Sequence, residues 1–398
     1  MKILFTHRYF WPDSPPYAAM LIALARAFAA AGHDVRVFAG MPSYRQGDAN
    51  PVAAAETLDG IAVRRCRVLA GEKRHIVLRL LNVLLYCGGL FWHILRTRPD
   101  VVTASTFPPV IAGWTASLAA RLAGARFVYH MQDVHPEVSA YSGGGMGRGL
   151  AYRLFRALDS QTMKRASAIV VLSDDMANTV RARGLKIVPV TVINNFSLTA
   201  RNQAEQAPPP ELVKPQGRRR AIFAGNLGRF QNLPALAEGI ALLFADHPDL
   251  ELLFLGDGEA LDGLKARWGD HPQVRFGPFL PFAQAKVLIR DADAGLVSLA
   301  PDIYNVSFPS KVQTYVELGL PILALVEPHS ALAREITTRG LGEVPASSAP
   351  QDIAAALSRL LTTPDRAEAL RAYTAETATL EAAFARWQTC LHALPARR

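Results

Sequence analysis

Short apolar runs alternate with amphipathic segments along the first half of the chain. The apolar runs predict strands, and the segments between them predict helices, among them residues 18–31, 109–122 and 150–165. The predicted strands read KILFTH, DVRVFAG, DVVTAS, ARFVYHMQD, SAIVVLS and PVTVINN, and Asp174 is expected to cap the helix after SAIVVLS. Strands and helices that alternate in this way form parallel sheets with helices on both faces.

The alternation breaks once and then resumes. Residues 198–219 are polar and rich in proline without an apolar period, so they predict a linker. A second set of strands follows and reads RAIFAGN, LELLFLGDG, QVRFGPF, AGLVSLA and LPILALV. The pattern predicts an α/β protein of two doubly wound, Rossmann-like domains, 1–197 and 220–379, that face each other across a cleft. A C-terminal helix within 380–398 is expected to cross back and pack on the first domain.

One apolar segment, residues 76–95, is long enough to be mistaken for a membrane span. Arg79, Asn82 and His93 interrupt it, and basic residues flank both of its ends. Three interpretations remain: a helix buried under a sheet, a helix lying in the interface of an anionic membrane, and a true span. The span is the least favoured, because the segments on either side read as one continuous domain.

Composition and charge narrow the class of partner. The chain has 398 residues, half of them apolar, and a formal net charge of +9, which suits anionic partners. The basic residues are scattered rather than gathered in an arm, which argues against nucleic acid. Cys66, Cys87 and Cys390 form neither a metal spacing nor a disulfide framework, which fits a reducing cytoplasm. The first apolar run is too short for a signal peptide and predicts a strand.

The loops after the predicted strands carry the unusual residues. In sheets of this kind, ligands bind beyond the carboxyl ends of the strands. The loop AGNLGRFQNL, residues 224–233, contains Gly225 and Gly228, which let backbone approach a ligand, and Arg229, which suits a phosphate beside the next helix. The alternative is a tight turn without a ligand, since glycine patterns alone have low specificity.

A second glycine loop, LGDGEALDGL at 255–264, directly follows a strand. Gly256 and Gly258 bracket Asp257 and permit close contact, for example with a nucleobase. The alternative is a strand-to-helix turn in which Asp257 makes a local hydrogen bond.

The stretch SFPSKVQTYVELGLP, residues 307–321, predicts one short helix. Ser310 is expected to cap it and Gly319 to end it. Free amides at its start and the charge of Lys311 suit a diphosphate. The alternative is that the same residues only cap the helix, without a ligand. Asn305, just upstream, is a candidate contact for a sugar or base, or a plain loop residue.

In the first domain, the richest stretch is HMQDVHPEV, residues 130–138. Two histidines and two carboxylates suggest a metal, but the spacing does not match that of zinc hydrolases and Pro136 breaks any helix there. Asp133 is better suited to orient hydroxyls or to act as a base, with His135 beside it. The alternative is that Asp133 and Glu137 hold the loop together.

The segment RYFWPDSPPYAA, residues 8–19, follows the first strand and leads into a helix. Asp13, Tyr17 and the helix amides are expected to meet the phosphate bound by the second domain from the opposite side of the cleft. The alternative is a rigid aromatic loop.

These motifs, with others spread over nearly the whole chain, carry a family resemblance. They are GNLGRFQ at 225–231, GDG at 256–258, PSK…GLP at 309–321, VVLSDDM at 170–176, VINN at 192–195 and QDVHPE at 132–137. The layout resembles the GT-B glycosyltransferases, most of all the large retaining nucleotide-sugar family of the family 4 type. Its members include transferases of bacterial capsule, O-antigen and colanic-acid assembly.

The resemblance implies that the second domain binds the nucleotide sugar and the first binds the acceptor. It implies no metal and no cofactor, because basic residues and helix ends neutralise the diphosphate. It also implies transfer with retention of the anomeric configuration, in which the leaving phosphate accepts the proton of the acceptor. It implies these roles: Lys311 and Arg229 for the diphosphate, Asp257 for the base, Thr314 for the ribose, Asp133 and His135 for the acceptor and transferred sugar. The remaining expected donor-binding residues are Tyr17, Gly225, Asn226, Gln231, Gly256, Gly258, Asn305, Pro309 and Ser310.

Some positions depart from the family pattern. Asn226 and Gln231 stand where many members have arginine and lysine, and Arg229 is expected to replace that charge. Thr314 stands where many have a ribose-binding glutamate, and Gln132 corresponds best to a family histidine.

The expected function is transfer of a hexose or N-acetylhexosamine from a nucleotide-diphosphate donor to a polyprenyl-diphosphate-linked glycan. Such an enzyme is expected in the cytoplasm, peripheral on the inner face of the cytoplasmic membrane. Two alternatives remain: a nucleotide-sugar epimerase of the same fold, which needs a paired acid and base, and a degenerate binder without catalysis.

Overall fold

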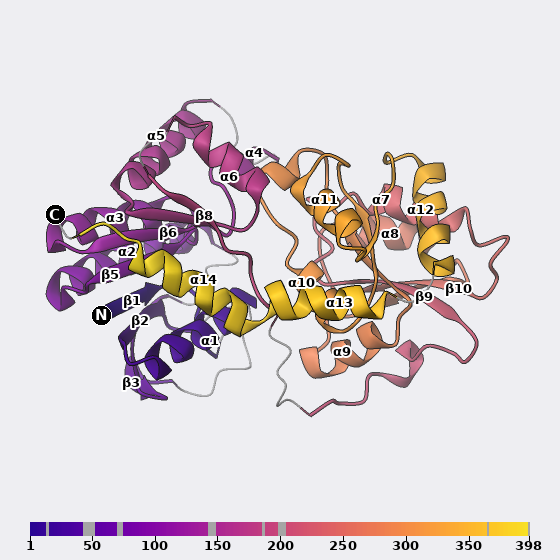
Figure 1. Cartoon of the computed structure of the whole chain (residues 1–398), viewed down its shortest axis with the longest axis horizontal. Coiled ribbons are helices and arrows are strands. Elements are labelled where there is room, and N and C mark those ends of the chain that lie inside the picture. Colours follow the sequence, from indigo (N-terminus) through magenta and orange to yellow (C-terminus); the bar gives the residue numbers. More distant parts are fainter. Residues whose placement is uncertain are drawn as a thin grey trace. The chain divides into compact units, whose positions relative to one another are not determined.

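The chain forms two compact units, one of Met1–Asn194 with Leu380–Arg398 and the other of Asn195–Thr379. Figure 1 shows a sheet flanked by helices in each unit. This computed structural model describes residues 1–12, 16–42, 52–69, 75–141, 149–184, 188–197, 204–363 and 366–396. Asp13 and residues 198–203 of the expected linker lie outside these ranges.

The first unit contains an eight-stranded sheet in the order β3-β4-β2-β1-β5-β6-β7-β8. All neighbours pair in parallel except β3, which runs antiparallel to β4. The strands are β1 (Lys2–Thr6), β2 (Asp34–Gly40), β3 (Ala55–Leu58), β4 (Ile61–Cys66), β5 (Val101–Ser105), β6 (Arg126–His130), β7 (Ala168–Val171) and β8 (Val190–Val192). The expected doubly wound sheet is confirmed, with the β3–β4 hairpin as an unpredicted addition at one edge.

Helices connect these strands, and the last helix of the chain joins the same unit. They are α1 (Pro16–Ala30), α2 (Ile76–Thr97), α3 (Ile111–Ala123), α4 (Glu137–Tyr141), α5 (Gly149–Arg165), α6 (Asp174–Arg181) and α14 (Leu380–His392). α14 packs on α1, where the rings of Phe384 and Phe28 meet edge to face at 4.8 Å. Trp387 and Leu391 enter the hydrophobic core formed by β1 and β2, so α14 is held by apolar burial.

The cap of α6 lies one residue earlier than expected. Ser173 has an extended backbone, with φ −147° and ψ 164°, and its side chain accepts a hydrogen bond from Met176 N at 3.2 Å. Asp174 is already the first helical residue, so the expectation that it caps the helix is wrong. A capping side chain must sit on the residue that still has non-helical dihedrals, and here that residue is the serine.

The second unit contains a fully parallel six-stranded sheet in the order β11-β10-β9-β12-β13-β14. Its strands are β9 (Arg219–Ala224), β10 (Leu250–Leu255), β11 (Val274–Gly277), β12 (Ala294–Ser298), β13 (Ile322–Leu325) and β14 (Gly342–Glu343). Its helices are α7 (Leu233–Ala241), α8 (Leu261–Trp268), α9 (Phe282–Arg290), α10 (Lys311–Glu317), α11 (Ala331–Thr338), α12 (Pro350–Thr362) and α13 (Ala367–Tyr373). The strands are almost entirely buried, as expected for a parallel sheet covered on both faces.

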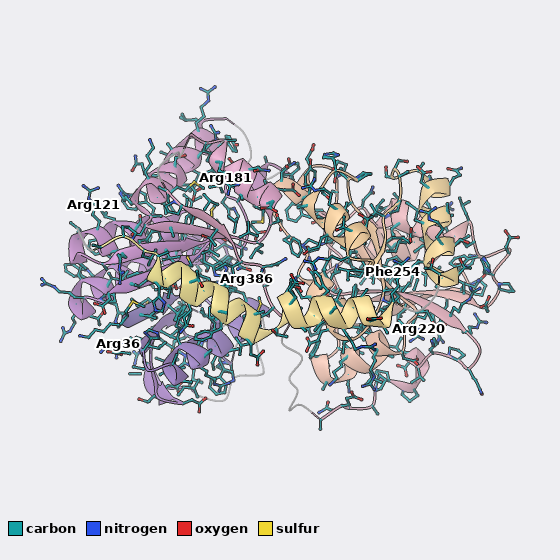
Figure 2. The ribbon with its side chains drawn as sticks, viewed as in Figure 1. Arg36, Arg121, Arg181, Arg220, Phe254 and Arg386 are labelled. Carbon is teal, nitrogen blue, oxygen red and sulfur yellow. The ribbon has the colours of Figure 1, made fainter. Side chains whose placement is uncertain are left out.

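A buried ion pair lies within this second sheet. Arg220 on β9 is fully buried and stands beside Glu251 on β10, with Arg220 Nη2 2.5 Å from Glu251 Oε1. Figure 2 shows Arg220 in the same unit as Phe254, whose ring packs against Phe276 at 5.5 Å. A buried charge needs its partner for stability, because both groups have lost their hydration on folding.

Helix α2 is neither wholly buried nor free of the domain. One face contacts α3, β2 and β4, and Asn82, Tyr86 and Leu90 are buried there. The opposite face exposes Leu84 by 66% and Trp92 by 70%. Among the described residues, α2 is the one helix long and apolar enough to cross a membrane by length and composition, and its window is only 28% buried. The interpretation as a helix fully buried under a sheet therefore does not describe its outer face.

Candidate active site

Two glycine loops meet at the carboxyl edge of the second sheet. β9 and β10 are parallel neighbours, so the loops that follow them emerge side by side. A Cβ on Gly256 would lie 1.9 Å from the carbonyl oxygen of Gly225, and a Cβ on Gly258 would lie 2.4 Å from that of Leu227. Both glycines have positive φ, 142° and 155°. The glycines at 256 and 258 are thus required by the contact between the two loops, before any ligand is considered.

Side chains of the first loop are largely occupied within the protein. Gln231 Oε1 accepts a hydrogen bond from Gly228 N at 2.7 Å and closes the turn. Arg229 makes two bonds to Glu259, with Nη2 2.6 Å from Oε1 and Nε 2.8 Å from Oε2. Asn226 is exposed. A diphosphate that uses Arg229 must therefore displace Glu259, a residue that the sequence did not indicate; exposed pairs of this kind are worth at most about 1 kcal/mol.

Lys311 differs from the other cations of this edge. Its Nζ lies 3.5 Å from the centre of the Phe223 ring on β9, and its Cε faces Gly225. No carboxylate forms an ion pair with it among the residues that the structure describes. Burial lowers the pKa of Lys311 to about 7. An ammonium that has lost water and gained only a ring face is poorly satisfied, and this favours a bound anion.

The start of α10 differs from the expectation. Ser310 has helical dihedrals, φ −59° and ψ −21°, and its side chain makes no capping hydrogen bond. The expected cap is wrong, because a residue already inside the helical turn cannot direct its hydroxyl back to the following amides. Gly319 ends the helix as predicted, with φ 75° and its amide bonded to Val316 O. The positive charge of this site therefore comes from the Lys311 side chain rather than from a capped helix end.

The other expected donor-binding residues lie around this edge. Asp257 Oδ1 accepts from Gly258 N at 2.8 Å, which is the local bond of the alternative interpretation. Thr314 and Pro309 are partly buried at and before α10, and Asn305 ends a short 3₁₀ turn after β12. The structure thus places the second-domain candidates on the loops that follow β9, β10 and β12 and, for Lys311 and Thr314, in α10.

In the first unit, the candidates lie at the carboxyl edge of β6. Asp133 N donates to Thr106 Oγ1 at 3.3 Å, and the His135 ring lies 3.4 Å from Ser139 Oγ. Tyr17, expected at the donor phosphate, lies with its hydroxyl 2.9 Å from His130 Nδ1. Burial lowers the pKa of His130 to about 3, so its ring is neutral at physiological pH.

A buried arginine holds this loop in place. Arg183 contacts both carboxylate oxygens of Glu137, pairs with Asp159 at 2.5 Å and donates to His135 O at 2.6 Å. Glu137 therefore serves the structure of the loop. Among the described residues, no group of three His, Cys, Asp or Glu side chains is arranged to hold a metal ion. No pattern in the sequence indicated Arg183, which is 46 residues from Glu137.

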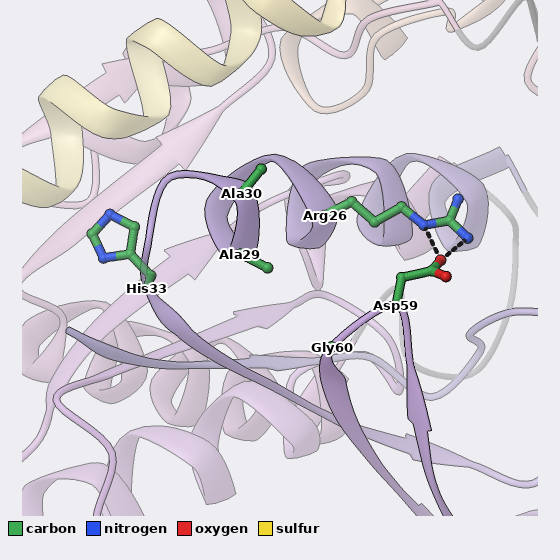
Figure 3. A pocket seen from close by; sticks show the side chains of 6 residues that line it. All are labelled: Arg26, Ala29, Ala30, His33, Asp59 and Gly60. Carbon is green, nitrogen blue, oxygen red and sulfur yellow. Dashed lines mark hydrogen bonds and ion pairs between the residues drawn. The ribbon is translucent and has the colours of Figure 1, made fainter.

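A shallow pocket lies at the opposite edge of the first sheet. Figure 3 shows it between α1 and the β3–β4 turn, with Arg26 bonded to Asp59 at 2.7 Å and His33 at its other end. His33 precedes β2 and Gly60 precedes β4, so the pocket lies at the amino ends of these strands. Ligands of doubly wound sheets bind beyond the carboxyl ends, and we do not assign the active site to this pocket.

Comparison with known proteins relates the chain to glycosyltransferases. Residues 18–195 match the model of the Glycosyl transferase 4-like domain. The chain is 28% identical over 269 residues to the probable glycosyltransferase WbjE of Pseudomonas aeruginosa, a match that covers 66% of each chain. Residues 18–195 therefore belong to a Glycosyl transferase 4-like domain. The chain is also 24% identical over 350 residues to the putative colanic acid biosynthesis glycosyl transferase WcaI of Escherichia coli, covering 84% of this chain and 85% of that one.

Solved structures, among them that of WaaG, a glycosyltransferase involved in lipopolysaccharide biosynthesis, have the same fold. The crystal structure of Anabaena HepE in complex with UDP and glucose aligns with a TM-score of 0.67 over 99% of this chain and 100% of HepE, at 16% identity. The GT-B fold is thereby confirmed for this glycosyltransferase, with its two Rossmann-like sheets.

Proposed function

We propose that this glycosyltransferase moves a sugar from a nucleotide-diphosphate donor to a polyprenyl-diphosphate-linked glycan in cell-surface polysaccharide assembly. The proposal includes retention of the anomeric configuration and no requirement for a metal. The UDP complex of HepE supports a nucleotide donor, and the name of WcaI supports polysaccharide assembly. The second unit would bind the donor, and the first unit the acceptor.

One observation carries the donor site: the ammonium of Lys311 lies on the Phe223 ring without a carboxylate partner among the described residues. A leaving diphosphate needs positive charge that is already in place when the glycosidic bond breaks. Lys311 fits this role because burial has removed the water that would otherwise compete. Arg229 would add a second charge once a phosphate displaces Glu259.

The direct test is nucleotide binding by the full-length protein. UDP should raise the apparent melting temperature with a dependence on UDP concentration, because a ligand that binds only the folded state stabilises it by mass action. GDP and TDP serve as comparisons for the base. Absence of stabilisation by every nucleoside diphosphate would remove the proposed donor site.

We predict that UDP binding weakens as pH rises above about 7. Below its pKa of about 7, Lys311 is protonated and attracts the diphosphate; above it, the protonated fraction falls about tenfold for each pH unit. UDP itself is fully ionised from about pH 7.5 upward, so Kd measured between pH 7.5 and 9 by calorimetry isolates the lysine. Lys311→Arg keeps its charge throughout this range and should flatten the profile. A wild-type Kd that does not change with pH would contradict the role of Lys311.

The epimerase alternative receives less support from the first unit. Such a reaction needs an acid and a base placed together, and Glu137 is engaged by Arg183. The experiment that separates the two is incubation with nucleotide sugar alone, since an epimerase yields an isomer without an acceptor.

We also propose that α2 binds the surface of an anionic membrane. Its outer face presents Leu80, Leu84 and Trp92, and Arg79, Arg96 and Arg98 are exposed beside them or at its end. An apolar face bordered by cations is the pattern of a helix that lies in the lipid interface. This arrangement would hold the enzyme near a lipid-linked acceptor on the cytoplasmic side.

Replacing Arg79, Leu80 and Leu84 together by glutamine should release the protein from anionic vesicles in a sedimentation assay. The change removes one charge and two apolar side chains from the lipid-facing side without touching the buried face. Leu242→Gln, at a leucine that is 50% exposed in the second unit, is the control and should sediment like the wild type. Equal sedimentation of both variants would show that α2 does not meet the lipid.

A further inference from the structure

Two aromatic rings lie at the carboxyl edge of the first sheet, apart from the residues assigned above. Tyr9 follows β1 and Phe107 follows β5, and these strands are parallel neighbours. The ring centroids are 5.0 Å apart, and the ring planes differ by 30°. Phe107 is 40% exposed although it stands between two buried segments. We call this pair the aromatic platform.

Buried side chains next to the aromatic platform hold its two rings in place. The His7 ring lies 6.2 Å from both the Tyr9 and Phe107 rings and 4.6 Å from that of Tyr17. Burial lowers the pKa of His7 to about 4, so it remains a neutral aromatic support. The Arg8 guanidinium lies 5.2 Å from the centre of the Tyr9 ring. The platform is therefore held in one geometry before a ligand arrives, which reduces the entropy cost of binding.

Hydrogen-bonding side chains lie near the platform, on α1 and on the segments that follow β5 and β6. The Tyr17 hydroxyl is bonded to His130, and Gln132 Nε2 lies 2.9 Å from His130 Nε2. Thr106, next to Phe107, accepts from the backbone of Asp133. An apolar face beside such groups differs from the outer face of α2, where leucines are bordered by arginines. The combination suits a ligand with a flat C–H face and hydroxyls at its rim, which describes a pyranose ring.

We propose that the aromatic platform of Tyr9 and Phe107 stacks against the C–H face of a pyranose ring of the glycan acceptor. The proposal rests on the proposed function, since it assigns a subsite of the acceptor in the first unit. Phe107 supplies the exposed face and Tyr9 the neighbouring ring that fixes its tilt. The nearby polar side chains give the sugar hydroxyls their partners.

The test uses the full-length protein and methyl pyranosides of glucose, galactose, N-acetylglucosamine and fucose as probes. In saturation-transfer NMR, the ring C–H protons of at least one pyranoside should receive saturation from the wild type. Phe107→Ala should weaken this binding about tenfold, the effect of losing one aromatic contact, and Phe107→Tyr should restore it. Trp92→Ala removes an aromatic residue of α2 in the same unit that is more exposed, at 70%, than Phe107, at 40%, and should leave the signal unchanged.

UDP binding separates this inference from the proposed donor site. Phe107→Ala should keep the stabilisation by UDP of the wild type, which also shows that the variant is folded. Loss of the pyranoside signal in Trp92→Ala, or no signal from any pyranoside while UDP still binds, overturns the platform. Transfer to the chain protons of a short polyprenyl phosphate, with none to sugars, would assign the platform to lipid and overturn it as well. Failure of UDP binding would instead count against the donor site.

Discussion

Replacing Lys311 with alanine should lower turnover by about 10²-fold or more and remove most of the stabilisation by UDP. The loss of one preorganised charge donor at a developing anion has an effect of this size. The Lys311 ammonium lies on the face of the Phe223 ring, without a carboxylate partner among the described residues. The measurement is sugar transfer to a lipid-linked acceptor alongside thermal shift with UDP. Near-normal turnover would remove the residue from the mechanism.

Lys311→Met provides the control for folding, because it should increase the stability of the ligand-free protein. The folded-state pKa of Lys311 is about 7, below the ordinary 10.5, so the folded state binds this proton less tightly than the unfolded state. The lysine therefore opposes folding fully below pH 7, and its unfavourable contribution falls as pH rises toward 10.5. We expect Lys311→Met to melt higher than the wild type at pH 6, with a difference that shrinks by pH 10. A variant that is more stable but does not respond to UDP separates a lost anion site from a damaged fold.

Arg220→Met should lower the free energy of unfolding by about 3–5 kcal/mol, the usual cost of leaving a buried charge without its partner. The substitution leaves Glu251 buried beside an apolar side chain, and its remaining cation is the partly exposed Arg275, whose Nη1 lies 4.0 Å from Glu251 Oε2. Urea unfolding measures the change. Arg219→Met is a matched control one residue away: Arg219 pairs with Asp249 at a partly exposed position and should cost about 1 kcal/mol or less.

The double variant Arg220→Met with Glu251→Leu tests the reason for this loss. It removes both charges, so no unpaired group stays buried, and most of the lost stability should return. If Arg220→Met alone cost no more than Arg219→Met, the pair would contribute nothing through its burial.

The sequence by itself determined the elements whose signal is local. Buried parallel strands such as LELLFL and ARFVY read as unbroken apolar runs, and Gly319 marks the end of α10 because only its own φ is involved. The fold class followed from that order of elements, and the family resemblance followed from the motifs in and around the loops after the strands. The β3–β4 hairpin was not predicted from the sequence, because β4 reads IAVRRC and its two adjacent arginines obscure the alternation of buried and exposed residues. Ser310 and Ser173 show that a helix N-cap depends on backbone dihedral angles, which the residue types alone do not specify.

The tertiary structure alone decided which charges are satisfied. Glu259 neutralises Arg229 from 30 residues away, and Arg183 joins Glu137, Asp159 and the His135 carbonyl across 24 to 48 residues. The Lys311 ammonium lies on Phe223, 88 positions earlier in the chain (311 − 223 = 88), without any local pattern that indicates it. Charge satisfaction depends on burial and on distances through space, and these arise only when separate strands bring their carboxyl ends to one edge of a sheet.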